Sequence, residues 1–224
     1  MMFNRREVLS FTAGLAFAAG SAKAAAEPWQ EGKHYFKINS PPPAPGTVVA
    51  AVTEVFSYGC PACNAFLPYM NSIEKKLPAN SVDYVPASWI AAENWPLFQR
   101  AYLTAKALGV ARKAHDQMFA AVWSTGELGI SDPRTGRPRN PLPTIQDVAR
   151  FYQRVTGVTE AKFLEAAKSF SVDTECRRAD AQIKRFLADS TPTLVIKGKY
   201  RFEPRSAGGG AQAVDLAVWL AQKA

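Results

Sequence analysis

Two cysteines separated by two residues, Cys60 and Cys63, are the residues of this chain best suited to chemistry. They lie in the segment "EVFSYGCPACNAFLPYM", between an apolar run and a segment whose apolar residues repeat with helical spacing. A cysteine thiolate is both a nucleophile and a metal ligand. The pair could therefore form a reactive disulfide, a structural bridge or half of a metal site.

The alternatives to a reactive pair are weak. A bridge that closes so small a loop constrains the unfolded chain very little. Structural zinc takes four ligands, and besides the pair the chain offers only Cys176, His34 and His115, which form no second matched cluster. Haem attachment requires a histidine directly after the second cysteine, where this chain has Asn64. The sequence favours a reactive pair.

The two cysteines are expected to differ in reactivity because of their place on a helix. Pro61 suits the first turn of a helix, so Cys60 would precede that turn and face its unpaired N–H groups. These groups and the helix dipole favour a charged thiolate. Cys63, one turn further in, would be more buried. We expect substrate thiols to attack Cys60. We expect Cys63 to resolve the mixed disulfides that form.

The elements around the pair have the order β, α, β, helical block, β, β, α. Residues 47–57 form a near-continuous apolar and β-branched run that predicts a central strand, and 81–89 predict a second strand parallel to it. Residues from about 94 to 188 are mainly helical in pattern, interrupted by a loop at 125–143 that is predicted to be exposed. Residues 193–203 predict a hairpin that turns at Gly198 and Lys199, and 209–224 predict a closing helix.

Two segments together resemble the thioredoxin-like thiol oxidoreductases, and within them the exported DsbA group. They are "EVFSYGCPAC" and "STPTLVIKGKYRF", with the helical block between them. The resemblance implies an α/β thioredoxin fold with an inserted helical domain. It places a discontinuous thioredoxin-like domain at 25–90 and 189–224 and the inserted domain at 91–188. It also implies that the Cys60–Cys63 disulfide is the redox centre and that no other cofactor or metal is used.

The resemblance implies roles for further residues. Pro192 is expected to adopt a cis peptide bond and to pack against the disulfide, although it could be an ordinary proline at the start of a strand. Glu54 is expected to lie beneath the disulfide as a catalytic residue that shuttles protons to Cys63; the alternative is a glutamate at a sheet edge. The residues predicted to bind substrate are Pro61, Ala62, Thr191 and Tyr58.

One departure concerns the direction of electron flow. Ala62 stands where strong oxidants of the group carry histidine, so we expect a less oxidising disulfide. We predict an oxidase that acts on reduced exported proteins and is reoxidised by a membrane partner of the DsbB type. The alternatives are a periplasmic reductase or isomerase and, from other classes, a chaperone or a copper-binding thiol module.

The remaining sequence features concern location and partners. Residues 1–24 resemble a cleaved signal peptide, with Arg5 and Arg6 before an apolar segment, so we expect a periplasmic protein. The net charge is +8, but the basic residues are scattered, and no nucleic-acid binding is expected. Few residues precede the first strand, which argues against the design of dimeric isomerases with an extra N-terminal domain, and we expect a monomer. Cys176 is interpreted as a free thiol and His115 as a packing residue.

Overall fold

The computed structural model describes residues 27–39, 49–132 and 134–223, and its centre is a five-stranded mixed sheet. The sheet has the order β1-β5-β4-β2-β3. All five residues of β2 are buried, so the predicted central strand is confirmed, although it begins only at Val52. The predicted signal peptide lies outside the described residues. The strands are β1 (Phe36–Lys37), β2 (Val52–Phe56), β3 (Val82–Pro86), β4 (Thr193–Ile196) and β5 (Tyr200–Phe202).

The strand directions follow from the connections. Helix α1 (Pro61–Lys76) joins β2 to β3, and these two strands are parallel, as a crossover helix requires. Strand β4 is antiparallel to both β2 and β5. The predicted hairpin is confirmed, but its turn lies one residue earlier: Lys197 and Gly198 have positive φ, and the Lys199 N–H donates to the Ile196 carbonyl at 2.9 Å.

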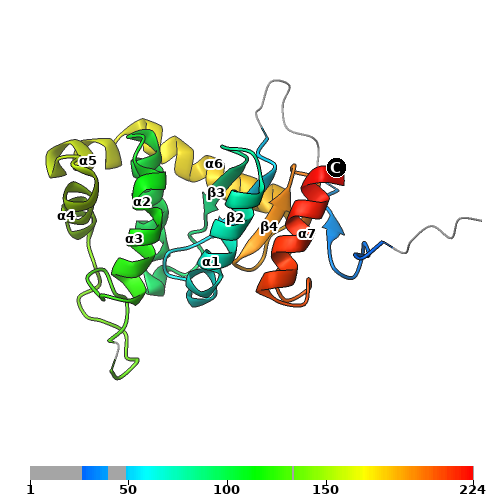
Figure 1. The fold of residues 1–224 in the computed structure, drawn as a ribbon. Helices are drawn as coiled ribbons and strands as arrows, with labels where there is room; N and C mark the ends of the chain where they lie inside the picture. The colour runs from blue at the N-terminus through cyan, green and yellow to red at the C-terminus, as the bar shows by residue number, and fades with distance from the viewer. Residues whose placement is uncertain (1–26, 40–48, 133, 224) are drawn as a thin grey trace, which may run out of the picture.

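The helical block follows β3. Figure 1 shows α2 to α5 gathered at one end of the molecule, with α1 and α7 beside the strands. Thr144 and Thr159 are N-caps of two of these helices, because each side chain accepts a hydrogen bond from a backbone N–H of the first turn. The helices are α2 (Trp95–Ala107), α3 (Ala111–Trp123), α4 (Ile145–Thr156), α5 (Glu160–Ala167), α6 (Phe170–Phe186) and α7 (Gly210–Lys223), and the 3₁₀ turn η1 (Ala91–Glu93) precedes α2.

Helix α6 links the helical block to the sheet. It contacts α2 within the block and β3 at the sheet edge. Its residues fall inside the predicted inserted domain, whose limits of 91 and 188 stay a prediction. No helix in the described parts of the chain combines the length and apolar character needed to cross a bilayer.

The structure corrects one expectation about an exposed segment and adds one strand. The loop at 125–143 is partly anchored, because Leu128 and Ile130 are buried and the Arg139 guanidinium donates to the Gly126 carbonyl at 2.6 Å. In addition, the sequence did not indicate β1, which pairs antiparallel with β5. Two residues are too few to show the alternation that predicts a strand.

Candidate active site

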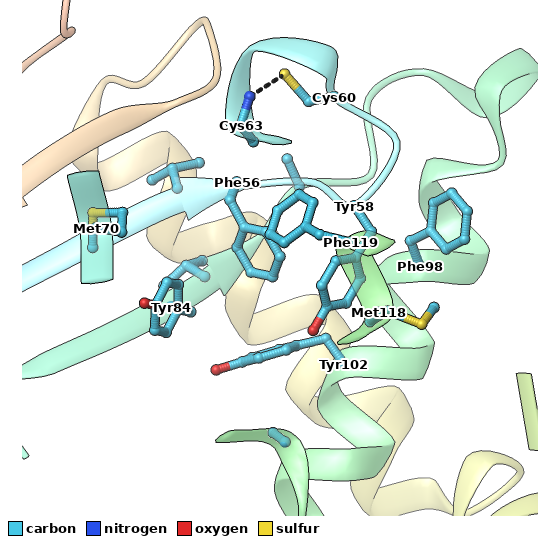
Figure 2. Close-up of a cluster of buried hydrophobic side chains, with 14 of the residues drawn as sticks. Phe56, Tyr58, Cys60, Cys63, Met70, Tyr84, Phe98, Tyr102, Met118 and Phe119 are labelled. Carbon is cyan, nitrogen blue, oxygen red and sulfur yellow. Dashed lines mark hydrogen bonds between the residues drawn. The ribbon is translucent and has the colours of Figure 1, made fainter. Parts of the chain in front are cut away.

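The cysteine pair lies at the start of α1, directly after the central strand. Cys60 is the N-cap of the helix, which begins at Pro61 as predicted. The Cys63 backbone N–H donates to the Cys60 sulfur at 3.4 Å, and Figure 2 shows the pair above a cluster of aromatic side chains. Both cysteines are free thiols, 5% and 1% exposed. The sulfur of Cys60 therefore lies next to backbone N–H groups of the first turn of α1 that have no partner within the helix.

The two thiols are electrostatically unequal. The hydrogen bond from the Cys63 thiol, followed by contacts with Thr191 and the backbone of Cys63 and Ala62, lowers the pKa of Cys60 to about 6 against the opposing effect of burial. Burial, and then its hydrogen bond to Cys60, raises the pKa of Cys63 well above its usual value. At neutral pH, Cys60 is therefore a thiolate and Cys63 a thiol. This is the asymmetry expected from the sequence.

A distant segment completes the site. The peptide bond between Thr191 and Pro192 is cis, as the resemblance implied. The Cys60 thiol donates to the Thr191 carbonyl at 3.5 Å. The residue pair just before β4 thus lies beside the reactive sulfur.

Glu54 is a buried carboxyl group in the middle of β2. It is 2% exposed, which contradicts the alternative of a glutamate at a sheet edge. Burial raises the pKa of Glu54 well above its usual value, and the charges of Cys60 and then Glu74 raise it further. Burial and the influence of the Cys60 charge are consistent with a position beneath the cysteine pair.

A pocket of about 460 Å³ adjoins the cysteines. Of the predicted substrate-binding residues, Ala62 and Thr191 line it together with Pro192, whereas Pro61 is exposed at the start of α1 and lies outside its lining. The other lining residues were not predicted: Ala65, Phe66, Tyr69, Ser190, Glu203, Pro204, Arg205 and Gly210. Ala65, Phe66 and Tyr69 follow the motif on α1, but no local signal links them to the other lining residues, which come from distant segments of the chain.

Among residues 27–39, 49–132 and 134–223, no three histidine, cysteine or acidic side chains are grouped so that they could hold an ion.

Comparison with known proteins identifies the family of the chain. No family model matches it. DsbA from Pseudomonas aeruginosa is 32% identical over 216 residues, which cover 96% of this chain and 95% of the relative. DsbA from Pseudomonas syringae is 30% identical over 221 residues, which cover 98% and 95%. The chain belongs to the DsbA family. Its relatives are named thiol:disulfide interchange proteins.

Solved structures agree with this assignment. The crystal structure of Pseudomonas aeruginosa DsbA matches with a TM-score of 0.70 and 28% identity over 87% of this chain and 94% of that one. DsbA from Xylella fastidiosa matches with a TM-score of 0.69 and 26% identity over 84% and 94%. The protein is therefore a DsbA-like thiol:disulfide oxidoreductase with a thioredoxin fold and an inserted helical domain. Its Cys-Pro-Ala-Cys pair occupies the helix start described above.

One predicted substrate contact of this DsbA-like protein is wrong. Tyr58 was expected to line a groove, but its side chain is 0% exposed. Its ring packs edge-on against Phe56 and Phe119 (Figure 2). Its hydroxyl lies 3.0 Å from Nδ1 of His115. The sequence placed an aromatic beside the motif but could not show that α3 covers it.

Proposed function

We propose that the protein donates the Cys60–Cys63 disulfide to reduced exported proteins during their oxidative folding. The observation that carries this proposal is the stabilised thiolate of Cys60, whose pKa is lowered to about 6. Stabilising the thiolate stabilises the reduced enzyme, and a stable reduced enzyme makes its disulfide a stronger oxidant.

The proposed reaction moves two electrons from a substrate dithiol to the enzyme. A substrate thiolate attacks the Cys60 sulfur, the bond between Cys60 and Cys63 breaks, and Cys63 leaves and takes up a proton. Glu54, protonated in its buried site, is the proposed donor of that proton. The second substrate thiolate then attacks the substrate sulfur of the mixed disulfide. Cys60 leaves as a thiolate, and the substrate carries the new disulfide.

The surroundings of Cys60 suit an extended substrate segment. We assign Thr191 and Pro192 as the backbone edge beside which a substrate strand lies, with Pro61 and Ala62 on the opposite side of the sulfur. The adjoining pocket is lined by both aromatic and charged side chains, so it fits one apolar substrate side chain with polar groups at its rim.

Repeated turnover requires an acceptor for the electrons. We assign this role to a quinone-linked membrane protein of the DsbB type and place the enzyme in the periplasm as a monomer, after removal of residues 1–24. No cofactor besides the cysteine pair enters the reaction.

The decisive test is the equilibrium of the pair with a series of glutathione redox buffers, followed by oxidation of a reduced protein substrate. We expect a potential well above that of thioredoxin, which is about −270 mV. A value near that of thioredoxin would favour a reductase and overturn the oxidase. In the variant with both cysteines changed to serine, we expect no effect on substrate folding; persistent binding of unfolded chains would instead identify a chaperone.

A further inference from the structure

The peptide group between Tyr58 and Gly59 is held at both of its polar atoms. The Nε1–H of Trp123, the last residue of α3, donates to the Tyr58 carbonyl at 2.8 Å. On the other side, the Gly59 N–H donates to the Ser57 hydroxyl at 3.1 Å. A peptide plane bonded at both ends has a fixed orientation, and only the Gly59–Cys60 peptide separates this plane from Cys60.

The side chain of Tyr58 is held by the same helix. Its hydroxyl lies 3.0 Å from Nδ1 of His115, which is also on α3 and is 3% exposed. Burial lowers the pKa of His115 to about 3, so the imidazole is neutral at neutral pH. Helix α3 therefore contacts Tyr58 through both the main chain and the side chain.

A second helix of the inserted block closes against the same loop. A Cβ atom on Gly59 would lie 2.7 Å from Nε1 of Trp95, so the absence of a side chain lets the α2 indole pack on the backbone. Trp95 is 4% exposed, and its Nε1–H donates to Glu93 at 3.2 Å. Any larger residue at position 59 would separate the loop from α2.

The fixed peptide determines where the sulfur of Cys60 lies. The Cys60 N–H donates to the Ser57 carbonyl at 3.1 Å, so residues 57–60 form a turn with little freedom. From this turn the Cys60 sulfur reaches the Cys63 N–H and the Thr191 carbonyl. A rotation of the peptide plane would move the sulfur away from both.

We propose that Trp123 and His115 are positioning residues that act through Tyr58 to hold Cys60 at the helix start. The inserted helices are then part of the active-site support. The consequence for catalysis rests on the proposed function, whereas the effect on the Cys60 thiol does not.

The first test replaces Trp123 with phenylalanine, which removes the N–H donor and retains an aromatic ring. The matched control is Trp219→Phe, a similarly half-buried tryptophan on α7 that packs on Tyr35. The reduced proteins are alkylated with iodoacetamide over a pH series, and the peptide that carries Cys60 is quantified by mass spectrometry. This readout separates Cys60 from Cys176 and needs no substrate.

We expect Trp123→Phe to slow alkylation of Cys60 near pH 6 by about fivefold, the change typical of one net hydrogen bond, and to move the pH midpoint upward. Trp219→Phe should match the wild type. An unchanged midpoint in a folded Trp123→Phe protein would overturn the proposal.

Tyr58→Phe and His115→Phe provide a second test in case the tryptophan variant does not fold. Each removes one partner of the same contact and keeps a ring of similar size. If the contact positions Cys60, both variants raise the midpoint, and the double variant is no worse than the more affected single variant. Fully additive effects, or none, would contradict the proposal. An enzyme that fails to oxidise substrates would contradict only the proposed function.

Discussion

In its protonated form, the Cys60 thiol donates a hydrogen bond at 3.5 Å to the backbone carbonyl of Thr191, which lies 131 positions further along the chain. The contact forms only when the segment before β4 is seated beside α1. The reactivity of Cys60 therefore depends on the folded sheet as well as on the helix that begins next to it.

The lowered pKa of Cys60 predicts that the stability of the reduced protein depends on pH. Its folded pKa of about 6 lies below the ordinary value of 9.0. The thiolate therefore stabilises the reduced fold fully above pH 9, and this stabilisation is lost as the pH falls through 6. Urea unfolding should show that the difference in unfolding free energy between reduced and oxidised protein changes with pH, because the thiolate contribution to the reduced protein is lost at low pH. A Cys60→Ser protein that keeps the same pH slope as the reduced wild type would contradict this.

Replacing Glu54 with glutamine should stabilise the protein and slow its chemistry. Because the folded pKa of Glu54 is raised, its contribution to stability is present below pH 4.5 and is lost as the pH rises toward the folded pKa. Glu54→Gln removes this loss, so its advantage in unfolding free energy should grow with pH. We expect formation of the mixed disulfide, the step in which Cys63 leaves and takes up a proton, to slow on the order of a hundredfold, the low end of proton-transfer effects.

Stopped-flow measurement of mixed-disulfide formation checks the kinetic part of this prediction. Glu165→Gln, at an exposed position on α5, is the control and should leave both quantities unchanged. Equal rates of mixed-disulfide formation in wild type and Glu54→Gln would remove the proton-transfer role.

Replacing Ala62 with histidine should make the disulfide more oxidising. Ala62 is exposed next to Cys60, and a histidine there can donate to the thiolate in addition to the backbone donors. We expect about a tenfold change in the glutathione equilibrium, or about 30 mV. Ala65→His, in the following turn, places the same ring too far away and serves as the control. A potential that moves equally in both variants would rule out a local contact.

Replacing Gly210 with alanine should narrow the pocket beside the cysteines. The added Cβ atom would lie 2.4 Å from the Tyr69 ring, which must shift. Tyr69 is 39% exposed, so the ring can move and the stability should change by less than about 1 kcal/mol. We expect a several-fold higher KM for a cysteine-containing peptide and an unchanged glutathione equilibrium.

The control for this prediction is the same Gly210→Ala substitution made in a Tyr69→Ala protein. In that variant, Gly210→Ala should have no further effect on KM, because the ring that it displaces is absent. An equal rise in KM in both backgrounds would show that the effect of Gly210→Ala arises outside the pocket.

Local sequence signals predicted the parts of the site that depend on neighbouring residues. The β-branched run before Cys60 predicted β2, and Pro61 predicted the helix start that lowers the pKa of the thiol. The proline before β4 was found through the family resemblance, since no local signal links it to a cysteine so far away.

Contacts between distant segments were not predictable from the same signals. Tyr58 could have faced solvent or the interior, and only the packing of α3 determines its burial. The pocket depends on Tyr69 from α1 meeting Gly210 at the start of α7. Neither pairing leaves a periodic pattern in the chain.

The outermost strand β1 has only two residues, Phe36 and Lys37, and Lys37 forms an ion pair with Glu31 at 3.1 Å. A long open strand offers unpaired N–H and C=O groups to any extended chain it meets, which is how sheets come to aggregate. An enzyme that works on unfolded proteins meets such chains constantly. Because β1 is short and charged, this edge of the sheet offers few unpaired backbone groups to which an incoming chain could add as a further strand.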